Sequence, residues 1–216
     1  MKTSLDRDLK LLYKTLKPVI EIRIKEFTRL WTSGSEDELF QELAFCLMTP
    51  QSSAKACWEA VGRLFRNGLF YAGAAAELSD AIHPIRFKHN KARYMVAARS
   101  LFLPGGVPCL RRLLSIQGEP PRMREWLVKN VKGLGFKEAG HFLRNIGLGE
   151  DLAILDRHIL RTMNAHRVLR KIPDSINRKP YLLFEKKFKQ WADRLGIPPA
   201  HLDLLIWYQG TGYLFK

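Results

Sequence analysis

The stretch Val131-Lys-Gly-Leu-Gly-Phe-Lys137 lies between two apolar segments with helical periodicity and determines how the chain is interpreted. Glycine has no Cβ, so Gly133 and Gly135 allow a tight turn between two helices and a close approach of another backbone. A helix that begins at Phe136 presents unpaired N–H groups and the positive end of its dipole, which together form an anion site. The stretch therefore predicts a helical hairpin whose tip binds a phosphate, with Lys137 in the first turn of the second helix.

Charge identifies the kind of anion. The 216 residues include 36 Lys and Arg against 21 Asp and Glu, which gives a formal net charge of +15. Such an excess attracts polyanions at long range, so nucleic acid is the leading partner. An anionic membrane surface is the competing target, but the chain has no apolar run of about 18 residues and its basic residues are spread among amphipathic segments. We therefore expect no membrane association.

The N-terminus and the cysteines bear on compartment and cofactors. The segment 1–10 contains acidic residues and no continuous apolar run, unlike a signal peptide, so we expect an intracellular protein of the cytoplasm and nucleoid. Cys46, Cys57 and Cys109 include no Cys-x-x-Cys pair, which argues against a disulfide framework, a zinc site or an iron-sulfur cluster. We interpret them as small core residues and expect neither a metal nor another cofactor.

Helical periodicity runs through most of the chain and predicts an all-α protein. Ser35-Glu-Asp-Glu38 matches a capping box ahead of the apolar residues that begin at Leu39, and Thr49-Pro50 ends that helix. Val19–Ile24 alternates like a strand, but no second strand is available to pair with it, so we expect it to be helical or extended. Further helices are expected over residues 54–65, 90–102, 123–130, 136–146, from 156 onward, 181–195 and 198–208.

Two residues near the hairpin suggest chemistry. A lysine amine is nucleophilic only when unprotonated, and the positive end of a helix dipole is one environment that favours this. Asp156, in Ile154-Leu-Asp-Arg-His158, is expected to cap the next helix. A capping aspartate that faces a cleft can also stabilise a developing cation or accept a proton. Lys137 and Asp156 are thus the candidate catalytic residues.

The segments that contain Lys137 and Asp156 resemble those of a known enzyme family. The stretch 131–137 with Asp156 resembles the helix-hairpin-helix motif and downstream aspartate of the endonuclease III superfamily of DNA glycosylases. The longer strings 135–147 and 153–160 are similar, more narrowly, to the type-2 8-oxoguanine DNA glycosylase/AP lyases, and the resemblance covers nearly the whole chain. No cysteine follows Cys109, so the branch with a C-terminal four-cysteine cluster is disfavoured.

The resemblance implies a bifunctional enzyme acting on damaged double-stranded DNA. Lys137 would attack C1′ of a flipped 8-oxoguanine nucleotide and hold the sugar as a Schiff base, after which β-elimination cuts the strand. Asp156 would stabilise the charged sugar. Because extruding a base costs a few kcal/mol, such an enzyme also needs a wedge and an aromatic pocket.

The same resemblance assigns these supporting roles. Gln51, with Ser52 beside it, would be the wedge, although both could instead cap the following helix. Trp207 would stack on the damaged base, and Lys216 would take part in recognising it. Independently of the resemblance, the residues themselves make Arg157 and His158 candidate DNA contacts, beside Gly133 and Gly135 in the hairpin. A solvated helix face is the alternative for Arg157, and a structural role is the alternative for His158.

We therefore expect one glycosylase domain over residues 1–216, acting as a monomer, with two helical lobes flanking a DNA-binding cleft. One lobe would span about 33–150 and the other 1–32 with 151–216. Two alternatives remain open: a non-catalytic helix-hairpin-helix module that only binds DNA, and a related glycosylase for another oxidised base.

Overall fold

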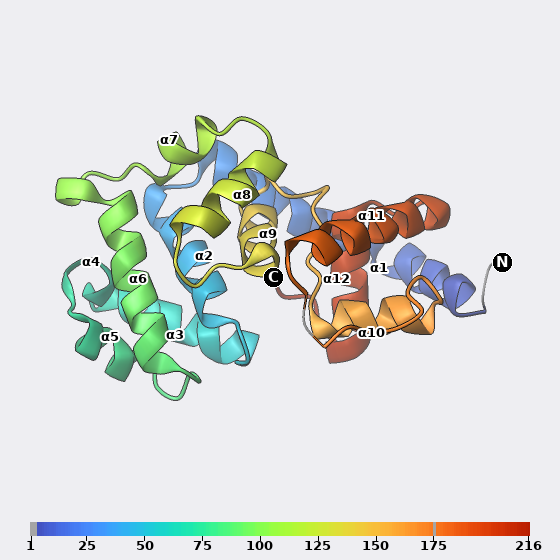
Figure 1. The fold of residues 1–216 in the computed structure, drawn as a ribbon, viewed down its shortest axis with the longest axis horizontal. Helices are drawn as coiled ribbons and strands as arrows, with labels where there is room; N and C mark the ends of the chain where they lie inside the picture. Colours follow the sequence, from blue (N-terminus) through green and yellow to red (C-terminus); the bar gives the residue numbers. More distant parts are fainter. Residues whose placement is uncertain (1–3, 175) are drawn as a thin grey trace. The chain divides into compact units, whose positions relative to one another are not determined.

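The computed structural model describes residues 4–174 and 176–216, which form helices and loops without any strand, as predicted (Figure 1). The helices are α1 (Ser4–Ser33), α2 (Glu36–Met48), α3 (Ala54–Arg66), α4 (Leu69–Ala72), α5 (Ala75–Ala81), α6 (Lys88–Phe102), η1 (Pro104–Gly106), α7 (Leu110–Ser115), α8 (Pro120–Asn130), α9 (Phe136–Asn145), α10 (Arg157–Ala165), α11 (Arg178–Leu195) and α12 (Pro199–Thr211).

The chain divides into two compact units. The middle unit is the continuous stretch Leu30–Phe142, and the N/C unit combines Met1–Arg29 with Leu143–Lys216. The divisions fall inside α1 and α9, whereas the sequence placed the lobe boundaries near residues 33 and 150. When the two ends of one helix belong to different units, the helical sequence pattern continues across the boundary between the units. Composition therefore does not locate the boundaries inside α1 and α9.

Helix α2 forms the core of the middle unit. Its start is the predicted capping box, in which Ser35 Oγ accepts from the Glu38 N–H at 3.2 Å and Glu38 Oε2 accepts from the Ser35 N–H at 2.8 Å. Apart from Gln41, every residue from Leu39 to Met48 is buried, because α3, α6 and α7 pack around it. A helix that is apolar on all sides is stable only in such an interior.

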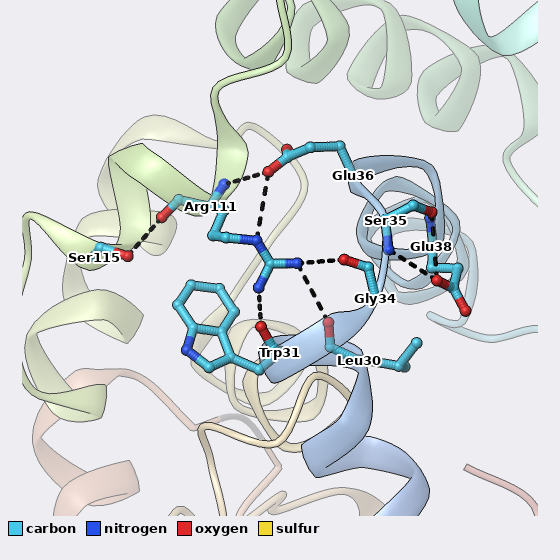
Figure 2. Close-up of polar contacts among 8 residues, drawn as sticks. All are labelled: Leu30, Trp31, Gly34, Ser35, Glu36, Glu38, Arg111 and Ser115. Atoms are coloured by element: carbon cyan, nitrogen blue, oxygen red, sulfur yellow. Dashed lines mark hydrogen bonds and ion pairs between the residues drawn. The ribbon is translucent and has the colours of Figure 1, made fainter.

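Arg111 of α7 closes the end of α1 (Figure 2). Its guanidinium donates to the backbone carbonyls of Leu30, Trp31 and Gly34, at and just after the last turn of α1. The same guanidinium lies 4.9 Å from the centre of the Trp31 ring, and its Nε is 3.8 Å from Glu36 Oε1. The half-buried guanidinium of Arg111 thus fixes the α1–α2 turn to α7.

The N/C unit is held together by polar contacts in its core. His166 Nδ1 lies 2.6 Å from Asp6 Oδ1, and the Trp191 indole donates to the same oxygen at 3.3 Å, with all three residues buried. A second contact joins the hydroxyl of Tyr13 to His201 Nδ1 at 2.9 Å. Helix α1 is therefore tied to the turn after α10, to α11 and to α12.

Several sequence expectations are corrected or refined. The short helices α4, α5 and α7 were not predicted, Val19–Ile24 is helical within α1, and Pro120 and Pro121 form the first turn of α8 instead of preceding it. All three cysteines are buried, as expected of core residues. Among the described residues, no helix is long and apolar enough to cross a membrane.

Candidate active site

The hairpin tip joins α8 to α9. Leu134 is only 5% exposed, and its N–H donates to the Val131 carbonyl at 3.2 Å, which closes the turn. Gly133 has a φ of +97°, in the left-handed region, and a Cβ there would lie 2.4 Å from Tyr94 Cδ2. Gly135 is not in that region, so the prediction that glycine serves the turn conformation holds for Gly133 alone. At Gly135 the space that a Cβ would fill is bordered by the Glu138 carboxylate, whose Oε2 would lie 3.0 Å from that Cβ.

The two arms of the hairpin are tied together beneath the tip. Arg124 of α8 is 1% exposed, and its guanidinium lies 5.2 Å from the ring centre of Phe136, the first residue of α9. Buried cation–π contacts of this kind stabilise by about 2 kcal/mol. Tyr94 of α6 supports the tip from below at Gly133. Side chains of α6 and α8 therefore support the hairpin tip.

Lys137 lies in the first turn of α9, and its side chain is 23% exposed. The two carboxylate oxygens of its neighbour Glu138 contact different parts of this turn. Glu138 Oε2 accepts from the Gly135 N–H at 3.2 Å, and Glu138 Oε1 lies 3.8 Å from Lys137 Nζ. Glu138 was not among the predicted site residues, although a glutamate three residues after the N-cap position is a capping signal.

The predicted wedge residue Gln51 is exposed at the tip of a turn between α2 and α3, with a left-handed φ of +55°. The alternative that Gln51 and Ser52 cap α3 is wrong, since Ser53 is the N-cap and makes no side-chain capping bond. Ser52 instead places its Oγ 3.0 Å from Lys91 Nζ. The turn is thus held from α6 and not by the helix that follows it.

Lys91 also connects this turn electrostatically with the candidate nucleophile. Burial lowers the pKa of Lys91, the nearby thiol of Cys57 raises it, and the positive charges of Arg86 and Lys137 lower it further. Burial raises the pKa of the Cys57 thiol to about 11, which leaves it protonated and inert at neutral pH. Within the middle unit, the turn that carries Gln51 and the first turn of α9 therefore share one neighbourhood.

Asp156 is the N-cap of α10, as predicted, and its Oδ1 accepts from the Ile159 N–H at 2.7 Å. The extended segment before it is fixed by α11. Tyr181 donates its hydroxyl to the Ala153 carbonyl at 2.6 Å, and Glu185 Oε1 accepts from the Ala153 N–H at 2.9 Å. This brace holds the half-buried aspartate in place. Sequence reasoning missed it because the bonded residues are 28 and 32 positions apart.

The two predicted DNA contacts beside Asp156 already have protein partners. His158 Nε2 is 2.9 Å from the Ile206 carbonyl of α12, and its ring occupies the space that a Cβ at Gly210 would fill at 2.3 Å. Arg157 is exposed, but its guanidinium donates to the carbonyls of Pro173 and Asp174. His158 thus fixes α10 against α12, and Arg157 fixes the loop before α11.

Trp207 and Lys216 lie at the C-terminal end of the N/C unit. Trp207 is half-buried, and among the described residues its indole Nε1–H has no hydrogen-bond acceptor although that atom is buried. After α12 ends at Gly212, with a φ of +77°, the last residues continue to the half-buried Lys216. A buried donor without an acceptor is costly, so the indole suits a ligand that supplies one.

The predicted residues therefore fall into two groups. The hairpin glycines, Lys137, Gln51 and Ser52 belong to the middle unit, whereas the N/C unit contributes Asp156, Arg157, His158, Trp207 and Lys216. Lys91, Tyr94 and Glu138 are additions from the structure. Within the described part of the chain, no group of three or more His, Cys, Asp or Glu side chains is arranged to hold a metal.

Comparison with known proteins gives consistent results. A family model described as 8-oxoguanine DNA glycosylase matches residues 20–197. The chain is 38% identical over 215 residues to the 8-oxoguanine DNA glycosylase/AP lyase of Fusobacterium nucleatum, covering 100% of this chain and 99% of that protein. It is 39% identical over 204 residues to the protein of that name from Korarchaeum cryptofilum, covering 93% and 92%.

Solved structures resemble the whole chain. The crystal structure of the 8-oxoguanine DNA glycosylase of Thermotoga maritima matches with a TM-score of 0.88 at 36% identity, covering 99% of each chain. The Methanocaldococcus jannaschii 8-oxoguanine glycosylase/lyase, crystallised with a 15mer DNA containing 8-oxoguanine, matches with a TM-score of 0.87 at 31% identity, covering 99% of this chain and 100% of that one.

Proposed function

This chain belongs to the helix-hairpin-helix 8-oxoguanine DNA glycosylase family, and from that premise we propose that it excises 8-oxoguanine from duplex DNA and then cuts the strand. The observation that carries the proposal is the position of Lys137. It lies in the first turn of the helix that follows the hairpin tip, and its side chain is partly exposed. The names of its relatives supply the substrate class.

In the proposed reaction, Lys137 Nζ forms a bond to C1′ of the damaged nucleotide while the bond from C1′ to the base breaks. The base leaves with the electron pair of that bond and takes up a proton. The sugar ring then opens to give a Schiff base on Lys137, and loss of a proton from C2′ expels the 3′ phosphate by β-elimination. Hydrolysis of the Schiff base returns the free amine.

Asp156 is proposed to balance the positive charge that develops on the sugar and to accept a proton from the lysine. The Tyr181 and Glu185 brace supports this role, because a charge-stabilising group acts best when it does not have to reorganise. The reaction would require both units of the chain, since Lys137 and Asp156 belong to different ones.

The remaining assignments complete the proposal. Gln51 would fill the space that the flipped nucleotide leaves, with Ser52 beside it. Trp207 would stack on the base, and Lys216 would help to recognise it. The N–H groups around Gly133 and Gly135 would bind a DNA phosphate, and Arg157 and His158, which belong to the other unit, would add contacts to the DNA. We propose that the protein acts as a monomer in the cytoplasm, at the nucleoid.

The experiment is borohydride trapping on duplexes that contain 8-oxoguanine, an oxidised pyrimidine or only normal bases. Wild type should form a covalent adduct on the 8-oxoguanine duplex, and Lys137→Gln should form none. Lys132→Gln is the matched control, because Lys132 is an exposed lysine of the same hairpin. We expect Asp156→Asn to slow adduct formation by roughly 100-fold or more.

Each other outcome has a distinct meaning. An adduct with Lys137→Gln equal to that of wild type contradicts the assignment of the nucleophile. An adduct on the pyrimidine lesion alone keeps the lysine chemistry but changes the substrate. Tight DNA binding without any adduct points to the non-catalytic module.

A further inference from the structure

We propose that Lys91 is a positioning residue for base extrusion. It fixes the turn carrying Gln51, the proposed wedge, relative to the helical hairpin. The inference rests on the proposed function for its substrate. Lys91 lies on α6 and is 3% exposed.

All three N–H groups of the Lys91 ammonium are directed at the turn. Nζ donates to the Met48 carbonyl at 2.6 Å, the Pro50 carbonyl at 2.8 Å and Ser52 Oγ at 3.0 Å. An ammonium has three protons to donate, and these contacts account for all of them. The acceptors lie on both sides of Gln51, so the side chain of Gln51 is the free tip of a loop that is fixed at each end.

The fixation is needed because Gln51 is a non-glycine residue with a φ of +55°. That conformation is less stable than the ordinary regions for a residue with a Cβ, so the surrounding contacts must enforce it. Hydrogen bonds to a charged donor are the stronger kind, and burial strengthens them further. Without Lys91, the turn would relax and Gln51 would lose its fixed position.

Helix α6 supports the hairpin as well as the turn. Lys91 holds the Gln51 turn, while one helical turn later Tyr94 lies against Gly133 at the hairpin tip. A single rigid helix thus sets the offset between the proposed wedge and the turn that precedes the nucleophile. Extrusion of a base and capture of its sugar require this offset to stay fixed, because small misplacements reduce rates strongly.

The main test variant is Lys91→Met, which keeps an unbranched apolar side chain but removes all three donors. Lys88→Met is the matched control: it makes the same change one turn earlier on α6, where the lysine pairs with the exposed Asp80 at 3.4 Å. Single-turnover rates are measured on a duplex with 8-oxoguanine and on a duplex with a preformed abasic site. The abasic duplex has no damaged base to extrude.

Lys91→Met should slow excision of 8-oxoguanine by roughly 10- to 100-fold, while cleavage at the abasic site changes by less than about threefold. In a Gln51→Ala background, Lys91→Met should add little further loss of excision, because it acts through Gln51. A similar loss on both substrates, or losses that multiply in the double variant, would overturn the proposal and leave Lys91 a residue of general stability.

Amide hydrogen exchange of residues 49–53 provides a readout that needs no substrate. Lys91→Met should accelerate exchange there and leave the amides of α9 as in wild type. If Lys91→Met does not fold, Lys91→Gln, a shorter side chain with two donors, takes its place with the same expected split. Unchanged exchange contradicts the proposal, whereas a wild type inactive on 8-oxoguanine with accelerated exchange in the variant contradicts only the proposed substrate.

Discussion

Glu138 places a negative charge at the point where the hairpin is proposed to meet a DNA phosphate. Its Oε2 accepts from the Gly135 N–H at 3.2 Å, and its other oxygen lies 3.8 Å from Lys137 Nζ. A phosphate that used the Gly135 N–H would displace this carboxylate. The cap stabilises the free hairpin and competes with the ligand at the same atoms.

Replacing Glu138 by Gln should therefore tighten binding to undamaged duplex by about two- to fivefold, since one like-charge contact is worth up to roughly 1 kcal/mol. The stability of the fold should hardly change, because glutamine also serves in a capping box. Fluorescence anisotropy at low and high salt measures the effect, which should shrink as salt screens the charge. Glu119→Gln, an exposed glutamate at the start of α8, should leave the affinity unchanged. An unaltered affinity for Glu138→Gln would show that no phosphate comes near this carboxylate.

At the scale of the element, the two hairpin glycines should respond differently to alanine. Gly133→Ala adds a Cβ at a φ of +97° and within 2.4 Å of Tyr94, so unfolding free energy should fall by about 1–3 kcal/mol. In Gly135→Ala the new Cβ meets only the flexible end of Glu138 at 3.0 Å, so stability should be near wild type while DNA affinity falls severalfold. Denaturant unfolding and anisotropy measure the two effects. Equal loss of stability in both variants would contradict this division of roles.

The sequence predicted those elements whose start or end is marked by residues close together in the chain. The capping box of α2 and the Asp156 cap of α10 were predicted because a cap joins residues three positions apart. The four-residue helix α4 has too few residues to show a period, and the predictions missed it. Local sequence also singled out Lys137 and Asp156, whereas the roles of Gln51, Trp207 and Lys216 came from family resemblance. The contacts that support these residues depend on tertiary packing, which no local pattern encodes. One example is the hydrogen bond from Lys91 to the Met48 carbonyl, which joins residues 43 positions apart.

At the scale of the whole molecule, the buried Asp6–His166 pair joins the two chain ends that form the N/C unit. Asp6→Ala would leave a buried imidazole and the Trp191 indole without their shared acceptor, which should lower unfolding free energy by about 3–5 kcal/mol. Urea denaturation of the full chain measures it. Asp8→Ala, an exposed aspartate on the same helix, should stay within about 0.5 kcal/mol of wild type. A comparably small loss for Asp6→Ala would mean that the pair does not close the unit.

The discontinuity of the N/C unit has a consequence for how the protein is made. Leu30–Phe142 is one uninterrupted stretch, whereas Met1–Arg29 has its packing partners in Leu143–Lys216. Domains generally fold as units during synthesis. On the ribosome, the middle unit can therefore complete its core first, while Met1–Arg29 waits for Leu143–Lys216 to emerge. The catalytic pair we propose comes into existence only after this later segment has emerged, because its aspartate belongs to that segment.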